Sequence, residues 1–149
     1  MIRPARIRDV EQVLVLLTDF ASASVLDYKS WTAQDLACAR ERLTNVILHH
    51  YLMVAEHDGT VVGMIGAMKE QDPWIGSRSR MRELFWWVTP AFRKKRLSVE
   101  LYLRWEQDCE RFIRDKLVDQ VSLSTQPGST NVNLDKRGWQ CVEQHWIKE

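Results

Sequence analysis

A strand that runs almost directly into a long amphipathic helix is the feature that most constrains how this chain can fold. Residues 82–88 alternate as a strand rich in aromatic side chains, and Pro90 ends the strand. From residue 97 to residue 117, apolar side chains return at helical spacing and form one stripe. Because such a stripe must pack against another apolar face, the strand–helix unit predicts an α/β layered fold.

The other predicted elements do not alternate strictly between strand and helix. Asp58-Gly59 lies between two strand-like runs and is a strong hairpin signal. Thr32 with Asp35, and Asp9 with Gln12, have capping-box spacing at the starts of two helices. We therefore predict one mixed central sheet with helices on both faces, in a single domain over residues 1–149. The predicted strands are 2–7, 51–56, 60–69, 82–88, 118–124 and 139–147, and the predicted helices are 10–20, 32–49, 97–117 and 130–137.

Charge and cysteine content exclude several classes of protein. Lys and Arg number 21 against 20 Asp and Glu, so the net charge of +1 does not indicate a polycation built for nucleic acid. No apolar run approaches the ~20 residues of a membrane span, and none of signal-peptide length follows the basic N-terminus. Cys38, Cys109 and Cys141 lack metal-ligand spacing, which predicts free thiols, no metal site and a cytoplasmic protein.

The turn after Pro90 carries four consecutive cations, which are Arg93, Lys94, Lys95 and Arg96. They stand at the start of the predicted helix, where the first backbone N–H groups have no helical acceptor and the helix dipole is positive. A strand that leads into such a helix start is a ready anion site, and the cations favour a polyphosphate ligand.

In this segment the chain resembles the GNAT superfamily of acyl-CoA-dependent N-acyltransferases. The central motif of that family is a strand ending in Val-x-Pro, then Arg or Gln, two residues, Gly, one residue, and Gly, Ala or Ser. Residues 2–6, 57–63 and 137–139 extend the resemblance, which covers most of the chain. It implies a GNAT-like fold and transfer of acetyl from acetyl-CoA directly to an amine. The motif here reads Val88-Thr89-Pro90-Ala91-Phe92-Arg93-Lys94-Lys95-Arg96-Leu97-Ser98.

The resemblance also implies roles for individual residues. In such enzymes the pantetheine arm of coenzyme A pairs with the strand, here the backbone of Trp86, Trp87 and Val88. The pyrophosphate rests on backbone amides of the turn. Three residues depart from the family pattern. Arg96 stands at the middle glycine, and Lys94 stands after the first Arg, where glycine is often found. Leu134 stands where a tyrosine often acts as general acid toward the leaving thiolate. The implied phosphate-binding residues are Arg93, Lys94, Lys95, Arg96, Leu97 and Ser98.

Glu83 is the candidate general base, because many relatives carry a base on this strand and the attacking amine must be deprotonated. An ordinary ion pair of Glu83 with Arg80 or Arg82 is the other interpretation, and a shift of one residue in register would turn Glu83 to the other face. Catalysis by positioning alone, without a dedicated base, also stays open. For the acceptor, we expect only that loops 21–31 and 71–80 shape its side of the cleft.

A second function stays open as well. A catalytically degenerate GNAT-fold module could bind or inhibit a protein or RNA through a basic, Trp-rich surface. Seven basic residues and one acid, Glu83, lie between residues 78 and 96, next to aromatic side chains that could stack on bases. Nucleic acid is the weaker partner, since no known binding motif accompanies these residues. An exposed tryptophan pair would favour a homodimer.

Overall fold

The computed structural model describes residues 1–24, 30–125 and 132–142. Its strands form a single sheet in the order β1-β2-β3-β4-β5. Neighbouring strands are antiparallel from β1 to β4, whereas β4 and β5 are parallel, which confirms the predicted mixed sheet. The strands are β1 (Ile2–Pro4), β2 (Tyr51–His57), β3 (Thr60–Gln71), β4 (Ser79–Val88) and β5 (Gln120–Ser122).

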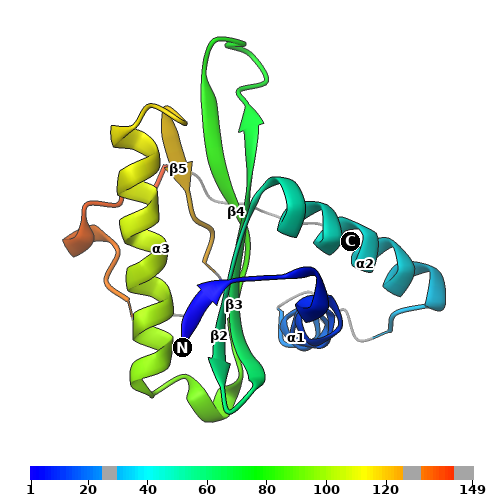
Figure 1. The fold of residues 1–149 in the computed structure, drawn as a ribbon. Coiled ribbons are helices and arrows are strands. Elements are labelled where there is room, and N and C mark those ends of the chain that lie inside the picture. The colour runs from blue at the N-terminus through cyan, green and yellow to red at the C-terminus, as the bar shows by residue number, and fades with distance from the viewer. Residues whose placement is uncertain (25–29, 126–131, 143–149) are drawn as a thin grey trace.

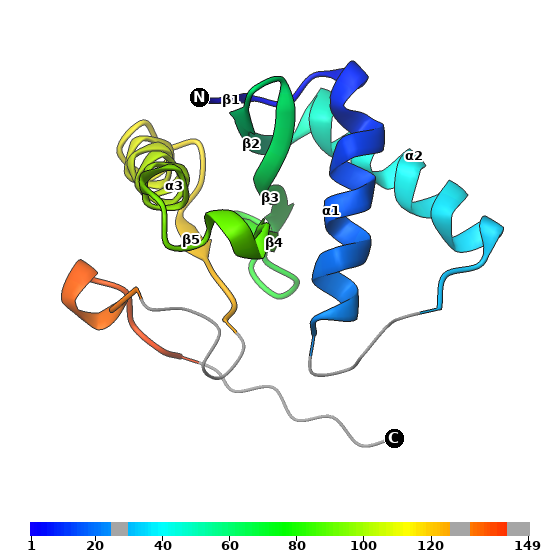
Figure 2. The ribbon, with the colours of Figure 1, turned by 90° about the horizontal axis from the view of Figure 1, so that it is seen from below.

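Helices cover both faces of this sheet, as predicted. The central strands lie between α3 on one side and the α1–α2 pair on the other (Figure 1), and the view from below shows the same three layers (Figure 2). No helix within the described ranges combines the length and the apolar character needed to cross a membrane. The α-helices are α1 (Val10–Ser22), α2 (Ala33–His49) and α3 (Arg96–Arg114), and the 3₁₀ helices are η1 (Ile7–Asp9), η2 (Pro90–Phe92) and η3 (Asp135–Arg137).

The sheet separates two hydrophobic cores. Trp105 of α3 is fully buried on one side together with Ile65 of β3. On the other side, Leu43 of α2 packs in the core that contains Met64, the neighbour of Ile65. Successive strand residues point to opposite faces, so β3 must be apolar on both. This explains why its sequence is an almost continuous apolar run rather than an alternating one.

Two local signals are confirmed in detail. Asp58 and Gly59 both have left-handed backbone conformations, with φ of 48° and 78°, as the tight turn between β2 and β3 requires. At the start of α2, the Thr32 hydroxyl accepts a hydrogen bond from the Asp35 N–H at 3.1 Å. In return, the Asp35 carboxylate accepts one from the Thr32 N–H at 2.8 Å, which completes the capping box.

The second predicted capping box, at Asp9 and Gln12, is wrong. α1 begins directly after Asp9, but the Asp9 carboxylate accepts hydrogen bonds from the Arg3 guanidinium and from the Arg6 N–H. The Gln12 side chain accepts one from the Val61 N–H of β3 at 2.8 Å. Both side chains therefore connect the start of α1 to the sheet region. Arg3 and Val61 take the place of the local partners that a capping box would have used.

The predicted C-terminal elements are also corrected. Of the helix expected over 130–137, the described residues form only η3, which ends at Gly138 with the left-handed φ of 82° that such a cap uses. Residues 139–142 form no strand, and the rest of the strand expected over 139–147 lies outside the described residues.

Elsewhere the predicted bounds shift for identifiable reasons. β3 and β4 pair as far as Gln71 and Ser79, so the loop between them is shorter than expected. α3 ends at Arg114 because Lys116 turns the chain with a φ of 55°. The first strand stops at Pro4 because η1 follows, and the strand expected over 118–124 is confined to β5.

Candidate functional site

The pairing between β4 and β5 ends halfway along β4. The parallel register joins Arg80 to Gln120 and continues only as far as Arg82 and Ser122. Among the described residues, β4 has no strand partner on this side from position 83 to 88. An open strand edge presents unpaired N–H and C=O groups to which an extended ligand can add as a further strand.

A β-bulge lies where the two strands separate. Phe85 is opposite Gly66 and Glu83 is opposite Ala67, so Leu84 is an extra residue in β4. Leu84 and Phe85 consequently both pack in the core beneath α1 and α2, whereas Trp86 packs on the α3 side. The alternation of the strand places Glu83 on the α3 side with Met81, so the bulge decides which side chains share a face.

Glu83 is a buried acid at the end of the paired part of β4. It is 6% exposed, and the Ser124 N–H donates a hydrogen bond to its carboxylate at 3.2 Å. Burial raises the pKa of Glu83 to about 7. The alternative ion pair with Arg80 or Arg82 is wrong, because both arginines pair with Glu70 of β3. A carboxyl group with a pKa near neutrality can accept a proton at ordinary pH.

The turn after β4 is held in place by its own first cation. The Arg93 guanidinium lies 4.2 Å from the centroid of the Trp87 ring, and its Nε donates to the Val88 carbonyl at 2.9 Å. The Ser98 hydroxyl lies within hydrogen-bond distance of the Arg93 and Lys95 carbonyls. Arg93 and Ser98 thus shape the turn with their side chains, and the backbone N–H groups of Arg93, Lys95 and Ser98 donate to carbonyls within the turn.

The start of α3 has no side-chain cap. Lys95 is the N-cap residue and makes no side-chain capping hydrogen bond, so the first backbone N–H groups of the helix, at Arg96 and Leu97, lack a helical acceptor. The Arg96 side chain is 90% exposed and pairs with Glu100 one turn along the helix. Arg96 has a negative φ, so it occupies the position of the family's glycine without backbone strain.

The other predicted cofactor-binding residues are split between surface and core. Lys94 and Lys95 are exposed, and the Lys95 ammonium lies 4.5 Å from the centroid of the Phe92 ring. Leu97 packs against the α3-side core. Leu97 can therefore contribute its backbone N–H, but not its side chain, to the binding of an anion at this turn.

A cluster that the sequence did not indicate joins the C-terminal segment to α3. Trp86 stacks on Tyr102 with ring centroids 5.2 Å apart, and the Tyr102 hydroxyl donates to Glu106 at 3.1 Å. Arg137 also donates to the Glu106 carboxylate and lies over the Tyr102 ring. Leu134 packs nearby against the α3-side core and brings no hydroxyl. The only sequence signal was the helical spacing of Tyr102 and Glu106.

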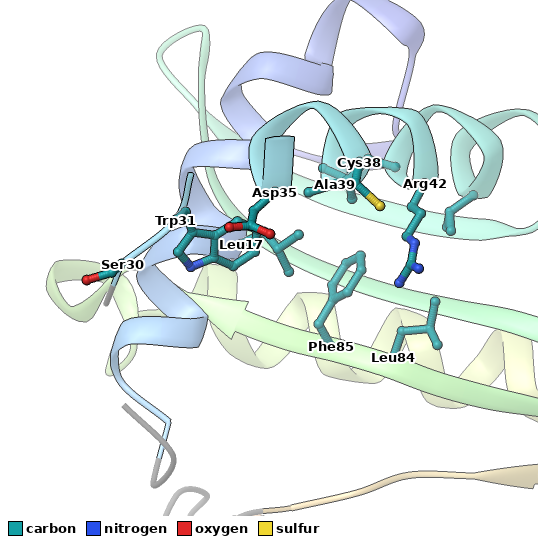
Figure 3. Close-up of a pocket in the computed structure, with 11 residues that line it drawn as sticks. Leu17, Ser30, Trp31, Asp35, Cys38, Ala39, Arg42, Leu84 and Phe85 are labelled. Atoms are coloured by element: carbon teal, nitrogen blue, oxygen red, sulfur yellow. The ribbon is translucent and has the colours of Figure 1, made fainter. Parts of the chain in front are cut away.

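A pocket of about 590 Å³ lies between α1, α2 and β4, on the opposite face of the sheet from α3. Figure 3 shows Leu84 and Phe85 rising from β4 toward side chains of α2. Of the two loops expected to flank the acceptor, the first contributes Ser30 and Trp31, with 25–29 outside the described residues, and the second contributes no lining residue. The lining residues are Leu17, Ser30, Trp31, Asp35, Cys38, Ala39, Arg42, Leu43, Val46, Leu84 and Phe85.

Solved structures share this fold over the whole chain. An acetyltransferase from Trypanosoma brucei is 20% identical, with a TM-score of 0.69 over 100% of this chain and 98% of that one. Glucosamine-6-phosphate N-acetyltransferase from Arabidopsis thaliana is 18% identical, with a TM-score of 0.68 over 100% and 97%. A predicted acetyltransferase from Clostridium acetobutylicum, solved with acetyl-CoA, is 14% identical, with a TM-score of 0.69 over 100% and 94%. These identities show the fold alone.

The sequence itself identifies the family. No curated protein matches the chain at a significant level. A model of the GNAT acetyltransferase family, however, matches residues 11–129, which include the bulged strand β4, the turn after it and the start of α3. The agreement of that match with the fold and with the open edge of β4 leads to one conclusion: this chain belongs to the GNAT family of acetyltransferases.

Proposed function

We propose that this protein is an acetyl-CoA-dependent N-acetyltransferase. The observation that carries the proposal is the continuity of two backbone surfaces, one without a strand partner and one without a side-chain cap within the described ranges. The open edge of β4 leads through one short turn into the uncapped start of α3. The first surface suits an extended amide-bearing arm, and the second suits a pyrophosphate. Coenzyme A contains both in this order.

The residues of this region fit the cofactor. The backbone of Trp86 to Val88 would pair with pantetheine. The amides of Lys94, Arg96 and Leu97 would hold the phosphates, because the other three amides between Arg93 and Ser98 already donate to backbone carbonyls. No acidic residue stands in the first turn of α3 to oppose an anion. Lys94 and Lys95 are exposed beside that turn and can add attraction for the phosphate charges.

Glu83 is the proposed general base. Acetyl-CoA, when bound, supplies an activated acetyl group, whose transfer forms the N–C bond to the amine and breaks the S–C bond. Glu83 would take the proton that the amine loses, directly or through water, and a pKa of about 7 suits this role. Since Leu134 has no hydroxyl and Tyr102 donates its own to Glu106, water would return a proton to the departing thiolate.

The RNA-binding alternative has less support. Arg80, Arg82 and Arg96 are each paired with a glutamate, and Arg93 packs on Trp87. Trp86 and Trp87 pack against the two cores. Among the described tryptophans, Trp74 at the tip of the β3–β4 hairpin has the exposure needed to stack on a base, at 91%. The basic, aromatic segment is thus largely committed to internal contacts.

The proposed cofactor site can be tested with two variants of one residue. Arg96→Ala removes the charge and keeps the backbone N–H, whereas Arg96→Pro removes both. Proline is tolerated at the first helical position, and Lys95 before it already has the extended conformation that proline requires (φ −97°, ψ 159°). The two variants should therefore fold equally well.

Calorimetric titration with acetyl-CoA should show micromolar binding by the wild-type protein. Losing an exposed charge should weaken binding up to about fivefold in Arg96→Ala. Losing an N–H that donates to a charged group should weaken it by roughly another tenfold or more in Arg96→Pro. Absence of binding by the wild type would overturn the proposal. Equal affinities of the two variants for acetyl-CoA would show that its phosphates do not bind at the start of α3.

A further inference from the structure

The pocket between α1, α2 and β4 has a consistent chemical character. One face of α2 supplies Asp35, Cys38 and Arg42 at helical spacing, and the same helix buries Leu43 beneath them. The floor is apolar, because the bulge turns both Leu84 and Phe85 toward this side. A volume of about 590 Å³ is that of a small-molecule site, which typically spans roughly 300–1,000 Å³.

The two charged residues of the pocket differ in how they are engaged. The Asp35 carboxylate accepts hydrogen bonds from the N–H and the hydroxyl of Thr32, so it is committed to the start of α2. Arg42 has no carboxylate partner among the residues that the structure describes. By contrast Arg40, two residues earlier on the same helix, is paired with Glu11 of α1.

Arg42 is also aimed at the pocket. Figure 3 shows its side chain extending from α2 toward Leu84, with the guanidinium beside the apolar floor. Arg42 is exposed at the rim of the pocket, and its guanidinium can offer paired N–H donors to a carboxylate or a phosphate.

We propose that the acceptor of this enzyme is a small primary amine with an apolar body and an anionic group, and that Arg42 binds the anionic group. This inference rests on the proposed acetyltransferase function. The pocket adjoins β4 at the bulge, where its lining residue Leu84 follows Glu83 in the chain, although the two side chains lie on opposite faces of the sheet. The apolar body fills the floor formed by Leu84 and Phe85, and Arg42 selects for the anion.

A matched pair of acceptors tests the selectivity. Para-(aminomethyl)benzoate and para-methylbenzylamine carry the same reactive amine on the same ring and differ in the carboxylate. The wild type should have a KM up to about fivefold lower for the carboxylate compound, as expected for an ion pair with an exposed arginine. Arg42→Gln should abolish the difference with little change in kcat, and Arg42→Glu should reverse the preference. Equal KM values in the wild type would overturn the inference.

Arg40→Gln is the matched control. It removes a guanidinium from the same helix outside the pocket lining. It should leave both KM values and the acetyl-CoA affinity unchanged. A loss of selectivity in Arg40→Gln as large as that in Arg42→Gln would attribute the preference to the general charge of α2, and the role of Arg42 would be rejected.

A second readout does not depend on catalysis. Cys38 lines the pocket one helical turn from Arg42, whereas Cys109 is buried and its thiol pKa is raised by that burial. In a Cys141→Ser background, iodoacetate and iodoacetamide differ mainly in charge. The rate of Cys38 alkylation by iodoacetate, divided by the rate with iodoacetamide, should fall severalfold in Arg42→Gln. The same ratio should stay unchanged in Arg40→Gln.

The same thiol separates failure of this inference from failure of the proposed function. Para-(aminomethyl)benzoate should protect Cys38 from iodoacetamide in the wild type and not in Arg42→Gln, whether or not acetyl transfer occurs. Protection of Cys38 without acetyl transfer would support the ligand-binding role of the pocket and contradict the proposed acetyltransferase function. Acetyl transfer without charge selectivity, or transfer to peptides alone, would contradict the acceptor assigned to the pocket. The proposed acetyltransferase function would be unaffected.

Discussion

Burial gives Glu83 a carboxyl group that titrates near neutrality and not near its ordinary value. The side chain has one described hydrogen-bond donor, the Ser124 N–H, and no ion pair within the described ranges. Its nearest cation in sequence, Arg82, instead pairs with Glu70. Desolvation therefore dominates, and the protonated form persists up to a pH of about 7.

The first prediction concerns the pH dependence of the rate. A general base acts only when deprotonated, so kcat/KM should rise about tenfold per pH unit below pH 7 and level off above it. Glu83→Gln should remove this rise of kcat/KM with pH and lower kcat/KM by a factor of roughly 10²–10⁴. The control is Glu70→Gln, which removes the partly buried carboxylate of β3 that pairs with Arg80 and Arg82 and should keep this pH dependence. A Glu83→Gln enzyme that retains the rise would assign the base elsewhere.

At the scale of elements, the bulge in β4 depends on a glycine in β3. A Cβ at Gly66 would lie 2.4 Å from the Phe85 ring, closer than real contacts allow. The ring covers Gly66 at the point where Leu84 is extra in β4. Glycine at this position therefore lets Phe85 lie flat and form the floor of the pocket.

Gly66→Ala should lower the free energy of unfolding by about 1–3 kcal/mol, because the Phe85 ring must move. The control is Gly76→Ala in the hairpin loop, where a Cβ would meet nothing within 4 Å, and its effect should stay within about 0.5 kcal/mol. Urea denaturation measures both. Equal stability of the two variants would show that the bulge accommodates a side chain.

The sequence predicted those elements whose signals are local. Asp58-Gly59 forms its turn, and Thr32 with Asp35 forms its capping box, because each pair needs only itself and the adjacent backbone. Gln12 could not be assigned, since its partner is the Val61 N–H far along the chain. The bulge at Leu84 has no local signal either, so the faces of Glu83 and Trp86 could not be fixed beforehand.

The candidate site follows the same division. The turn from Arg93 to Ser98 was assigned as an anion site from its motif, and this stays a prediction; the structure shows that the start of α3 has no side-chain cap. The contacts of Arg93 with Trp87 and Val88, and the Glu106–Arg137 pair, depend on tertiary packing. The pocket beside Arg42 also needs α1, α2 and β4 together, and no periodicity in one segment predicts such a cavity.

For the whole molecule, burial of Glu83 makes stability depend on pH. The pKa of Glu83 is raised in the folded protein, so its neutral form stabilises the fold fully below pH 4.5, and the contribution is lost as the pH rises through 7. A shift from 4.5 to about 7 corresponds to about 3 kcal/mol. Asp9 acts in the opposite sense: the Arg3 hydrogen bond lowers its pKa, and its contribution is lost only in acid below pH 3.8.

Stability measured by urea denaturation should therefore fall between pH 5 and pH 8. Glu83→Gln should show a flatter profile and should be more stable than the wild type at pH 8, because the amide needs no ionisation. A wild-type profile that rises over this interval would contradict the raised pKa of Glu83. The slope below pH 4 should be unaffected by the substitution, since Asp9 and not Glu83 titrates there.

The two cores on either side of the sheet have a consequence for evolution. The turn proposed to hold coenzyme A adjoins the α3-side core, whereas the pocket proposed for the acceptor belongs to the core beneath α1 and α2. Substitutions at Cys38 or Arg42 can then change the acceptor without disturbing the start of α3. The lineage of such a protein can change its amine acceptor while it keeps one acyl donor, because β4 borders the turn with one set of residues and the pocket with another.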